Sequence, residues 1–218
     1  MQKSPVQLRG MVIIDQMQPQ FAATIAANSD GYFPIPGETA CWVEVCPGIA
    51  VNRLLDAALK SCDVKPGAMI LERSYGTLEV HGEDQGQVRE AGSQVLQAAD
   101  QTAEDGLAPA VLSSEVVHQI DPHHAMMINK DRSGMLVLGD DTLYTLEVNP
   151  AIWVLLAANE AEKAAPVRIV SLENNGAVGR LQLAGSDAAI EAAVAAVGRA
   201  LEGAPGRSNP AREGGACF

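Results

Sequence analysis

Residues 44–47 read EVCP and residues 147–150 read EVNP, so glutamate, valine and proline recur in the same order. The offset between the two stretches is 103 residues (147 minus 44), and it aligns much of the chain without a gap. The matched positions are turn glycines, helix-opening prolines, a glutamine, a lysine and a strand valine: Gln16 and Gln119, Pro19 and Pro122, Gly31 and Gly134, Lys60 and Lys163, Val64 and Val167, Gly76 and Gly179, and Gly82 and Gly185. A shared backbone dictates such positions, which indicates that one unit was duplicated.

The repeat divides the 218-residue chain into two units, each of about 100 residues, the size of a small domain. Apolar residues make up 47% of the sequence and aromatic residues only 4%, which favours closely packed α/β units. Residues 100–109 (DQTAEDGLAP) are acidic and aperiodic, as is typical of a linker. We predict a first domain at 1–102, a second at 110–202, and a disordered tail at 203–218, where Gly, Pro, Arg, Asn and Glu dominate.

The overall charge argues against several classes of partner. The formal net charge is −12, with no cluster of Lys and Arg, so nucleic acid and anionic membranes are poor partners. No apolar stretch approaches the ~20 residues of a membrane span and no signal sequence opens the chain, so we expect a soluble protein. Cys41, Cys46, Cys62 and Cys217 follow no zinc or iron–sulfur spacing and are expected to be reduced thiols.

Hydrophobic periodicity and Gly or Pro punctuation predict seven elements in the first unit. Strands are expected at residues 6–14, 40–45, 68–71 and 76–81, and helices at 19–29, after Pro47-Gly48, and from Asp84 to Ala98. Asp84 is typical of a helix N-cap, and Gln87 is its expected capping-box partner.

The second unit repeats this order. Strands are expected at residues 116–120, 135–138, 143–148, 167–172 and 178–184, and helices from Pro122, over 151–164, and from a Ser186-Asp187 cap to about residue 201. Both units combine helices with a small sheet, so the predicted fold class is α/β (α+β).

The turn at residues 71–76 (LERSYG) is where the two units differ most in charge. Glu72 and Arg73 align with Asn175 and Gly176, so the charged pair belongs to one unit only. Its charges are therefore not expected to be needed for the fold. Most isolated Glu-Arg pairs are solvated surface turns, and that interpretation stays open for this pair when it is taken alone.

Several longer segments resemble the tandem-domain shell proteins of bacterial microcompartments, in particular the circularly permuted, double-stacking trimers similar to those of carboxysomes. The segments are DQMQPQFAATIA, WVEVCPGIAVNRLLDAALK, MILERSYGTLEVHGEDQGQVREAG, LLAANEAEKA and GAVGRLQLAGSDAAIEAA, which together span most of residues 8–201. The resemblance implies two tandem permuted shell domains, each a small antiparallel sheet flanked by helices.

The same resemblance implies a structural, non-enzymatic protein of a microcompartment shell in the bacterial cytoplasm. Three chains would form a pseudohexameric tile with a gated central pore for small metabolites. Two such trimers would stack, and hexameric and pentameric shell proteins would be further partners. No cofactor is implied.

Individual residues acquire expected roles from the resemblance. The pore and gate would comprise Glu72, Arg73, Tyr75 and Gly76, with Asn174, Asn175 and Gly176 as a neutral part of the rim, and Lys60 and Lys163 would contact neighbouring tiles. Without the resemblance, Asn174-Asn175-Gly176 indicates only a turn, and the two lysines only a solvated helix surface. The missing side chain of Gly76 is expected to let the turn change conformation without unfolding the sheet.

Two alternative functions remain at this point. His118, Asp121, His123 and His124 could ligate a metal, although the first unit has Asp15, Gln18, Gln20 and Phe21 at the same places, which favours ordinary helix-start and interface histidines. No nucleophile with a base, paired carboxylates or cofactor loop indicates an enzyme. A small-ligand-binding regulatory trimer without a role in a shell is the competing hypothesis.

Overall fold

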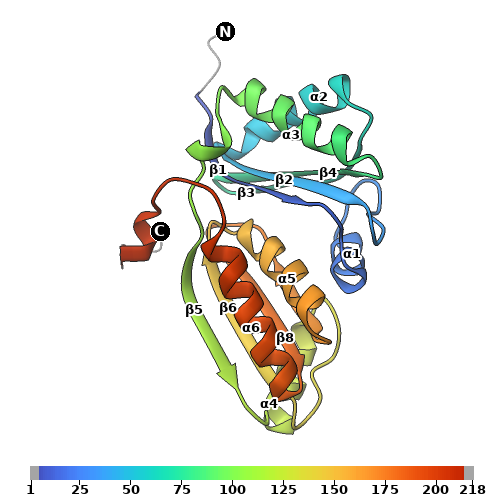
Figure 1. Cartoon of the computed structure of the whole chain (residues 1–218), viewed down its shortest axis with the longest axis vertical. Coiled ribbons are helices and arrows are strands. Elements are labelled where there is room, and N and C mark those ends of the chain that lie inside the picture. Colours follow the sequence, from blue (N-terminus) through green and yellow to red (C-terminus); the bar gives the residue numbers. More distant parts are fainter. Residues whose placement is uncertain (1–4, 214–218) are drawn as a thin grey trace.

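The computed structural model describes residues 5–213, and over that range the chain folds into two similar halves (Figure 1). The first half runs β1 (Gln7–Ile14), α1 (Pro19–Ala26), β2 (Thr39–Cys46), η1 (Gly48–Ala50), α2 (Val51–Ser61), β3 (Lys65–Glu72), β4 (Tyr75–Gly82) and α3 (Gln85–Ala99). The short turn η2 (Ala103–Asp105) leads to the second half. That half runs β5 (Ala110–Val117), α4 (Pro122–Asp131), β6 (Thr142–Asn149), α5 (Trp153–Ala164), β7 (Arg168–Glu173), β8 (Gly179–Gly185), α6 (Asp187–Glu202) and η3 (Pro210–Glu213).

Each half contains a four-stranded antiparallel sheet with the same topology. The strand orders are β1-β2-β4-β3 and β5-β6-β8-β7. Val45 of β2 lies opposite Leu8 and Gly76, and its repeat counterpart Val148 lies opposite Val111 and Gly179. The predicted fold class and the antiparallel sheets are therefore confirmed, and the register keeps the 103-residue offset. The domain limits 1–102 and 110–202 stay predictions.

The first sheet is covered on both faces. Helices α2 and α3 pack on one face over a core that includes Val43, Leu54 and Val88. The other face packs against α1 and against the second half, in a core that joins Trp42 to Ile152 and Leu155. Figure 1 shows this sheet lying between α2 and α3 above it and the second half below it. We call the contact between the halves the intrachain junction.

Helix α1 depends on the second half for its N-terminus. Its N-cap residue Gln18 makes no side-chain cap, and the backbone N–H groups of Gln20 and Phe21 instead donate to the Glu162 carboxylate of α5, each at 2.8 Å. A carboxylate at this position satisfies free N–H groups and interacts favourably with the helix dipole. The equivalent helix α4 is capped within its own half, because Asp121 accepts from His123 N at 2.8 Å.

One face of the second sheet is covered by α5 and α6, and the other is covered only in part, where α4 packs a small core that includes Ala125, Leu143 and Val170. Its other face and α4 line an open groove of about 540 Å³. Carboxylates and one guanidinium are among its lining groups: Glu115, Asp131, Glu147, Glu173 and Arg180. Trp42 and Glu44, the counterparts of the groove residues Thr145 and Glu147, are buried at the intrachain junction.

Two strand predictions in the second half are wrong. Residues 135–138 form a loop, because after Gly134 N and Met135 N bond to the β7 edge, Val137 N bonds to the Asn129 side chain at 2.8 Å. The strand expected at 116–120 is β5, which begins at Ala110 and ends at Val117. Its middle is polar and exposed in the single chain, so the hydrophobic pattern does not reveal it.

Three smaller expectations also need correction. Gln87 is not a capping-box partner, because its side chain accepts from Asp63 N at 3.0 Å, although Asp84 does cap α3. Strand β3 begins at Lys65, and a bulge carries it past Pro66. The disorder expected from residue 203 does not hold for the segment that packs on the linker, where Arg207 N bonds to Gly106 O at 2.8 Å. Residues 214–218 lie outside the described part of the chain.

Candidate functional site

Two hairpin loops lie side by side at the same end of the two sheets. Loop one comprises residues 72–75, the turn with the last residue of β3 and the first of β4, and loop two comprises residues 174–178, between β7 and β8. A Cβ atom placed on Gly176 would lie 3.6 Å from Glu72 Cγ, which is van der Waals contact. The structure therefore brings together the charged turn and the neutral turn that the sequence singled out.

Loop one presents its charges to solvent. The Arg73 side chain is 92% exposed, and its Nε lies 3.8 Å from Glu72 Oε1, beyond hydrogen-bond distance. An exposed pair of this kind stabilises the fold little. The two side chains are therefore free to adopt other positions.

The backbone shows which residues make the turns. Arg73 has φ +52° and Gly176 has φ +88°, so each loop contains one left-handed residue. Gly76 is no hinge, which corrects the expectation of a flexible end to loop one. It is buried in β4, where a Cβ atom would lie 2.3 Å from Gly48 O, so glycine is required there for close packing.

Arg9 of β1 contacts both loops. Its guanidinium lies 3.8 Å from the Tyr75 ring centroid and donates through Nη2 to Ala177 O at 3.3 Å. It also pairs with the buried carboxylate of Glu44. Cation–π stacking and two polar contacts fix one side chain between the loops.

Glu44 joins this arrangement to the intrachain junction. Its Oε2 accepts from Ile152 N at 2.9 Å. Burial raises the pKa of Glu44, while Arg9 and the bond from Ile152 act in the opposite direction. A buried carboxylate held by these donors links the first sheet to the start of α5.

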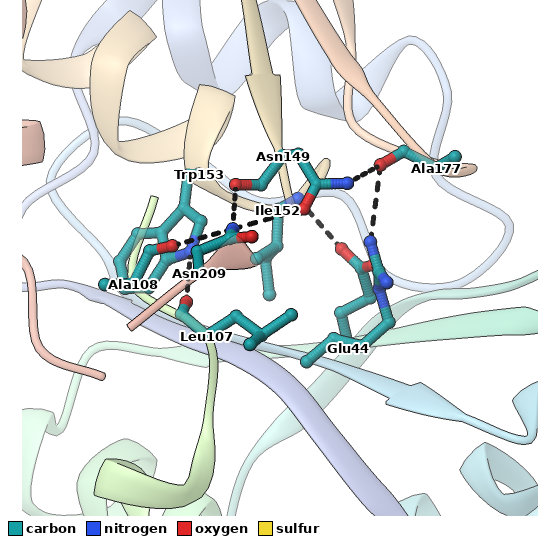
Figure 2. Close-up of polar contacts among 9 residues, drawn as sticks. Glu44, Leu107, Ala108, Asn149, Ile152, Trp153, Ala177 and Asn209 are labelled. Atoms are coloured by element: carbon teal, nitrogen blue, oxygen red, sulfur yellow. Dashed lines mark hydrogen bonds and ion pairs between the residues drawn. The ribbon is translucent and has the colours of Figure 1, made fainter. Parts of the chain in front are cut away.

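The C-terminal segment completes a polar network behind loop two (Figure 2). Asn149 Nδ2 donates to Ala177 O at 2.8 Å, and Asn209, which is 2% exposed, donates through Nδ2 to Asn149 O at 2.9 Å and to Ala108 O at 3.0 Å. Trp153 Nε1 donates to Leu107 O at 3.0 Å. Linker, C-terminal segment and loop two are thus held by one set of hydrogen bonds.

Two solved structures with this architecture are shell proteins of one microcompartment. The double ringed trimeric shell protein MSM0271 from the RMM microcompartment has a TM-score of 0.90 at 35% identity, covering 94% of this chain and 100% of that chain. The fused permuted hexameric shell protein MSM0275 from the same microcompartment has a TM-score of 0.88 at 37% identity, covering 90% and 96%.

Sequence comparison agrees. The model of the CsoS1D N-terminal domain matches residues 8–105. Carboxysome shell protein CcmP of Synechococcus elongatus is 45% identical over 205 residues, which cover 94% of this chain and 96% of that protein. The chain belongs to the tandem-domain microcompartment shell proteins. Carboxysome shell protein CsoS1D of Prochlorococcus marinus is a further member, 42% identical over 202 residues, which cover 92% and 79%.

As a tandem-domain shell protein, the chain is a structural component of a microcompartment shell in the bacterial cytoplasm and is not an enzyme. The sequence-based assignment to this family is confirmed. Within residues 5–213, no helix is long and apolar enough to cross a membrane.

The two lysines of this shell protein expected at tile edges lie on the exposed sides of α2 and α5. Lys60 Nζ pairs with Asp56 at 2.6 Å, and Lys163 Nζ lies 3.7 Å from Glu160. Each ion pair lies within a single helix and is exposed, so each lysine can exchange its partner for another at a small cost in free energy.

The histidines considered as metal ligands are dispersed. His118 Nδ1 lies 2.8 Å from Asp187, His123 Nδ1 lies 3.3 Å from Asp121, and His124 lines the open groove. In the described part of the shell protein, no three His, Cys, Asp or Glu side chains are arranged to hold a metal ion.

The described cysteines, Cys41, Cys46 and Cys62, carry free thiols, and Cys217 lies outside the described residues. Burial raises the pKa of the Cys41 thiol to about 12, which keeps it protonated and unreactive.

A buried pair of titratable groups escaped the sequence analysis. Glu79 and His81 of β4 are fully buried, with His81 Nδ1 3.0 Å from Glu79 Oε1, and burial raises the pKa of Glu79. The His81 Nε2 atom has no hydrogen-bond partner. The second half has Gln182 and Ala184 at these positions, and that difference is the signal that could have identified the pair.

Proposed function

We propose that three chains of this shell protein close into a ring of six repeat units around a central pore that passes small metabolites. The observation that carries the proposal is that the intrachain junction has an unfilled counterpart on the same molecule. Each half carries a free surface that corresponds to the surface that the other half buries in the intrachain junction. A rotation by a third of a turn about an axis would bring the free surface of one chain against that of the next.

Ile49 and Glu147 mark the unfilled junction. In the intrachain junction Ile152 is 0% exposed and bonds through its N–H to Glu44. The counterpart of Ile152 is Ile49, which is 67% exposed, and the counterpart of Glu44 is Glu147 in the open groove. Ile49 of one chain at Glu147 of the next would reproduce the contact.

The groove side of the second half supports the same ring. Phe21 of α1 is buried at the intrachain junction, whereas its counterpart His124 on α4 lines the open groove. Met126 and Met127 on α4 are 64% and 68% exposed. Large exposed apolar side chains beside a partly uncovered sheet face are typical of an interface with another chain.

The pore in this proposal is lined by loops one and two in alternation. Three copies of Arg73 would then face one axis, where like charges repel unless Glu72 of a neighbour, anions or water compensate them. Side chains turned inward would close the pore and side chains turned away would open it. A difference of only about 2 kcal/mol between the two states leaves both populated, so a ligand can shift the balance.

Two such rings are proposed to stack through an apolar loop patch that the repeat retains. The patch consists of Tyr32, Phe33 and Ile35 in the first half and their counterparts Met135, Leu136 and Leu138 in the second, all exposed. The residue types differ, but all six are large and apolar, which favours a shared role in contact with another surface. Lys60 and Lys163 are proposed to meet neighbouring hexameric and pentameric shell proteins at the tile edges.

Light scattering over a range of protein concentrations tests the ring. A trimer, or a stacked pair of trimers, is the expected result, and electron microscopy should show hexagonal tiles. A monodisperse monomer over that range would refute the ring. Discrete trimers that never form sheets and that bind one metabolite tightly would favour a regulatory trimer instead.

A further inference from the structure

Loop two is held by side chains from three distant parts of the chain. Its carbonyl at Ala177 accepts from Asn149 Nδ2 at 2.8 Å and from Arg9 Nη2 at 3.3 Å. Both donors are themselves fixed, since Arg9 pairs with buried Glu44 and Asn149 accepts from Asn209. Two bonds from immobilised donors restrict this carbonyl strongly.

Asn209 makes this restraint depend on the C-terminal segment, residues 203–211. Its amide Nδ2 is shared by Ala108 O, Asn149 O and Asn149 Oδ1, at 3.0, 2.9 and 3.2 Å. Figure 2 shows the Asn209 side chain beside Asn149, which in turn points toward Ala177. A buried amide with all these contacts orients Asn149 toward the loop.

Loop one lacks both side-chain donors. The counterpart of Ala177 is Ser74, whose carbonyl accepts from the backbone Gly48 N at 2.8 Å. The counterpart of Asn149 is Cys46, and the counterpart of Arg9 is Leu112, so neither position carries an amide or a guanidinium. The counterpart of Asn209 is Gly106, which has no side chain.

We infer that Arg9, Asn149 and the C-terminal segment through Asn209 are positioning elements that brace loop two as the fixed part of the pore rim. Loop one shares only the stacking of Arg9 on Tyr75 and lacks the two side-chain bonds to its carbonyl, so it is the part that moves. This role presupposes the proposed pore, whereas the contacts behind it lie within one chain. The aperture of the open pore is then limited by loop two, whose position the C-terminal segment sets.

Hydrogen–deuterium exchange of the full chain tests the brace, with peptides over residues 174–178 compared with peptides over 72–75. Asn149→Cys copies the first half, and we expect it to accelerate exchange in loop two about tenfold and to leave loop one unchanged. Asn209→Asp keeps the shape of the side chain but replaces the Nδ2 donor with an acceptor oxygen, so it should also accelerate exchange in loop two. The reverse exchange, Cys46→Asn, should slow exchange in loop one by offering Ser74 O a donor.

Gln94→Glu is the matched control, because it makes the same amide-to-carboxylate change on α3, where Gln94 Nε2 donates to Glu90 Oε1 at 2.7 Å and to neither loop. The brace is refuted if Asn149→Cys and Asn209→Asp leave loop two unchanged, or if they accelerate both loops equally. If Asn209→Asp fails to fold, Asn149→Cys and Cys46→Asn decide. Light scattering on the same samples separates the two proposals: a monomer with accelerated loop two overturns the pore and leaves the brace standing.

Discussion

Replacing Ile49 with alanine should weaken the ring by a measurable amount. The substitution removes three carbon atoms, each worth about 0.8 kcal/mol when buried, from a side chain that is 67% exposed in the single chain. Scaled by that fraction, the loss of association free energy is about 1.5 kcal/mol at each junction between chains and about 4.5 kcal/mol for a ring with three such junctions. Because about 1.4 kcal/mol is tenfold, the trimer dissociation constant should rise about a thousandfold.

The protein concentration at which half of the chains are assembled scales with the square root of that constant. We therefore expect the midpoint to rise about thirtyfold in sedimentation velocity or light scattering of serial dilutions. Monomer folding should not change, because Ile49 is exposed in the single chain. Unfolding at a concentration below the midpoint checks this.

Ile35→Ala is the matched control, since it removes the same three carbons from a side chain that is exposed but lies in the apolar loop patch. At concentrations at which rings do not stack, its monomer–trimer midpoint should equal that of the wild type. A midpoint that moves less than about threefold for Ile49→Ala, or equally for both variants, would contradict the placement of Ile49 at the junction.

Three further outcomes are expected. Replacing Glu72 and Arg73 together with alanine should leave trimer assembly and the melting temperature nearly unchanged and abolish the closed pore; a crystal structure of that variant with a blocked pore would refute the gate. Ile35→Asp should convert stacked rings to single trimers in light scattering, and persistent stacking would remove the apolar loop patch from that role. The raised pKa of Glu79 contributes stability at low pH, and this stability is lost as the pH rises through the pKa of Glu79 in the folded state. Glu79→Gln, which copies Gln182, should therefore show a smaller fall in melting temperature than the wild type from pH 5 to 8. Parallel curves for the two proteins would show that Glu79 does not titrate in that range.

The repeat predicts the fold because its matched residues are those that the backbone requires. Gly76 and Gly179 each lie where a Cβ atom would come within 2.3 Å of a carbonyl oxygen of the neighbouring turn, so neither copy can change them. The second half also shows what local patterns miss. The offset places residues 6–14 over 109–117, where β5 lies, but Ser113 and Ser114 hide that strand from a reading based on hydrophobicity alone.

The candidate site was predicted only in part. The adjacency of Glu72 and Gly176 follows from two hairpins of one duplicated sheet. The network that joins Arg9, Asn149 and Asn209 could not be derived, because it unites segments that no sequence spacing relates and because the tail was expected to be disordered. The signal available in the sequence was that Arg9, a charged residue within a predicted strand, aligns with the apolar Leu112 in the repeat.

The two ways of finishing a helix N-terminus set an order of events for the growing shell. Helix α1 is completed by Glu162 of the same chain, so the intrachain junction forms as part of folding, at a rate independent of concentration. Helix α4 makes its N-cap bond within its own half, through Asp121, so this helix needs no neighbour to cap it. Subunits can therefore fold before they assemble, and in the proposed ring the concentration of the protein, rather than its folding, decides when a tile begins to form.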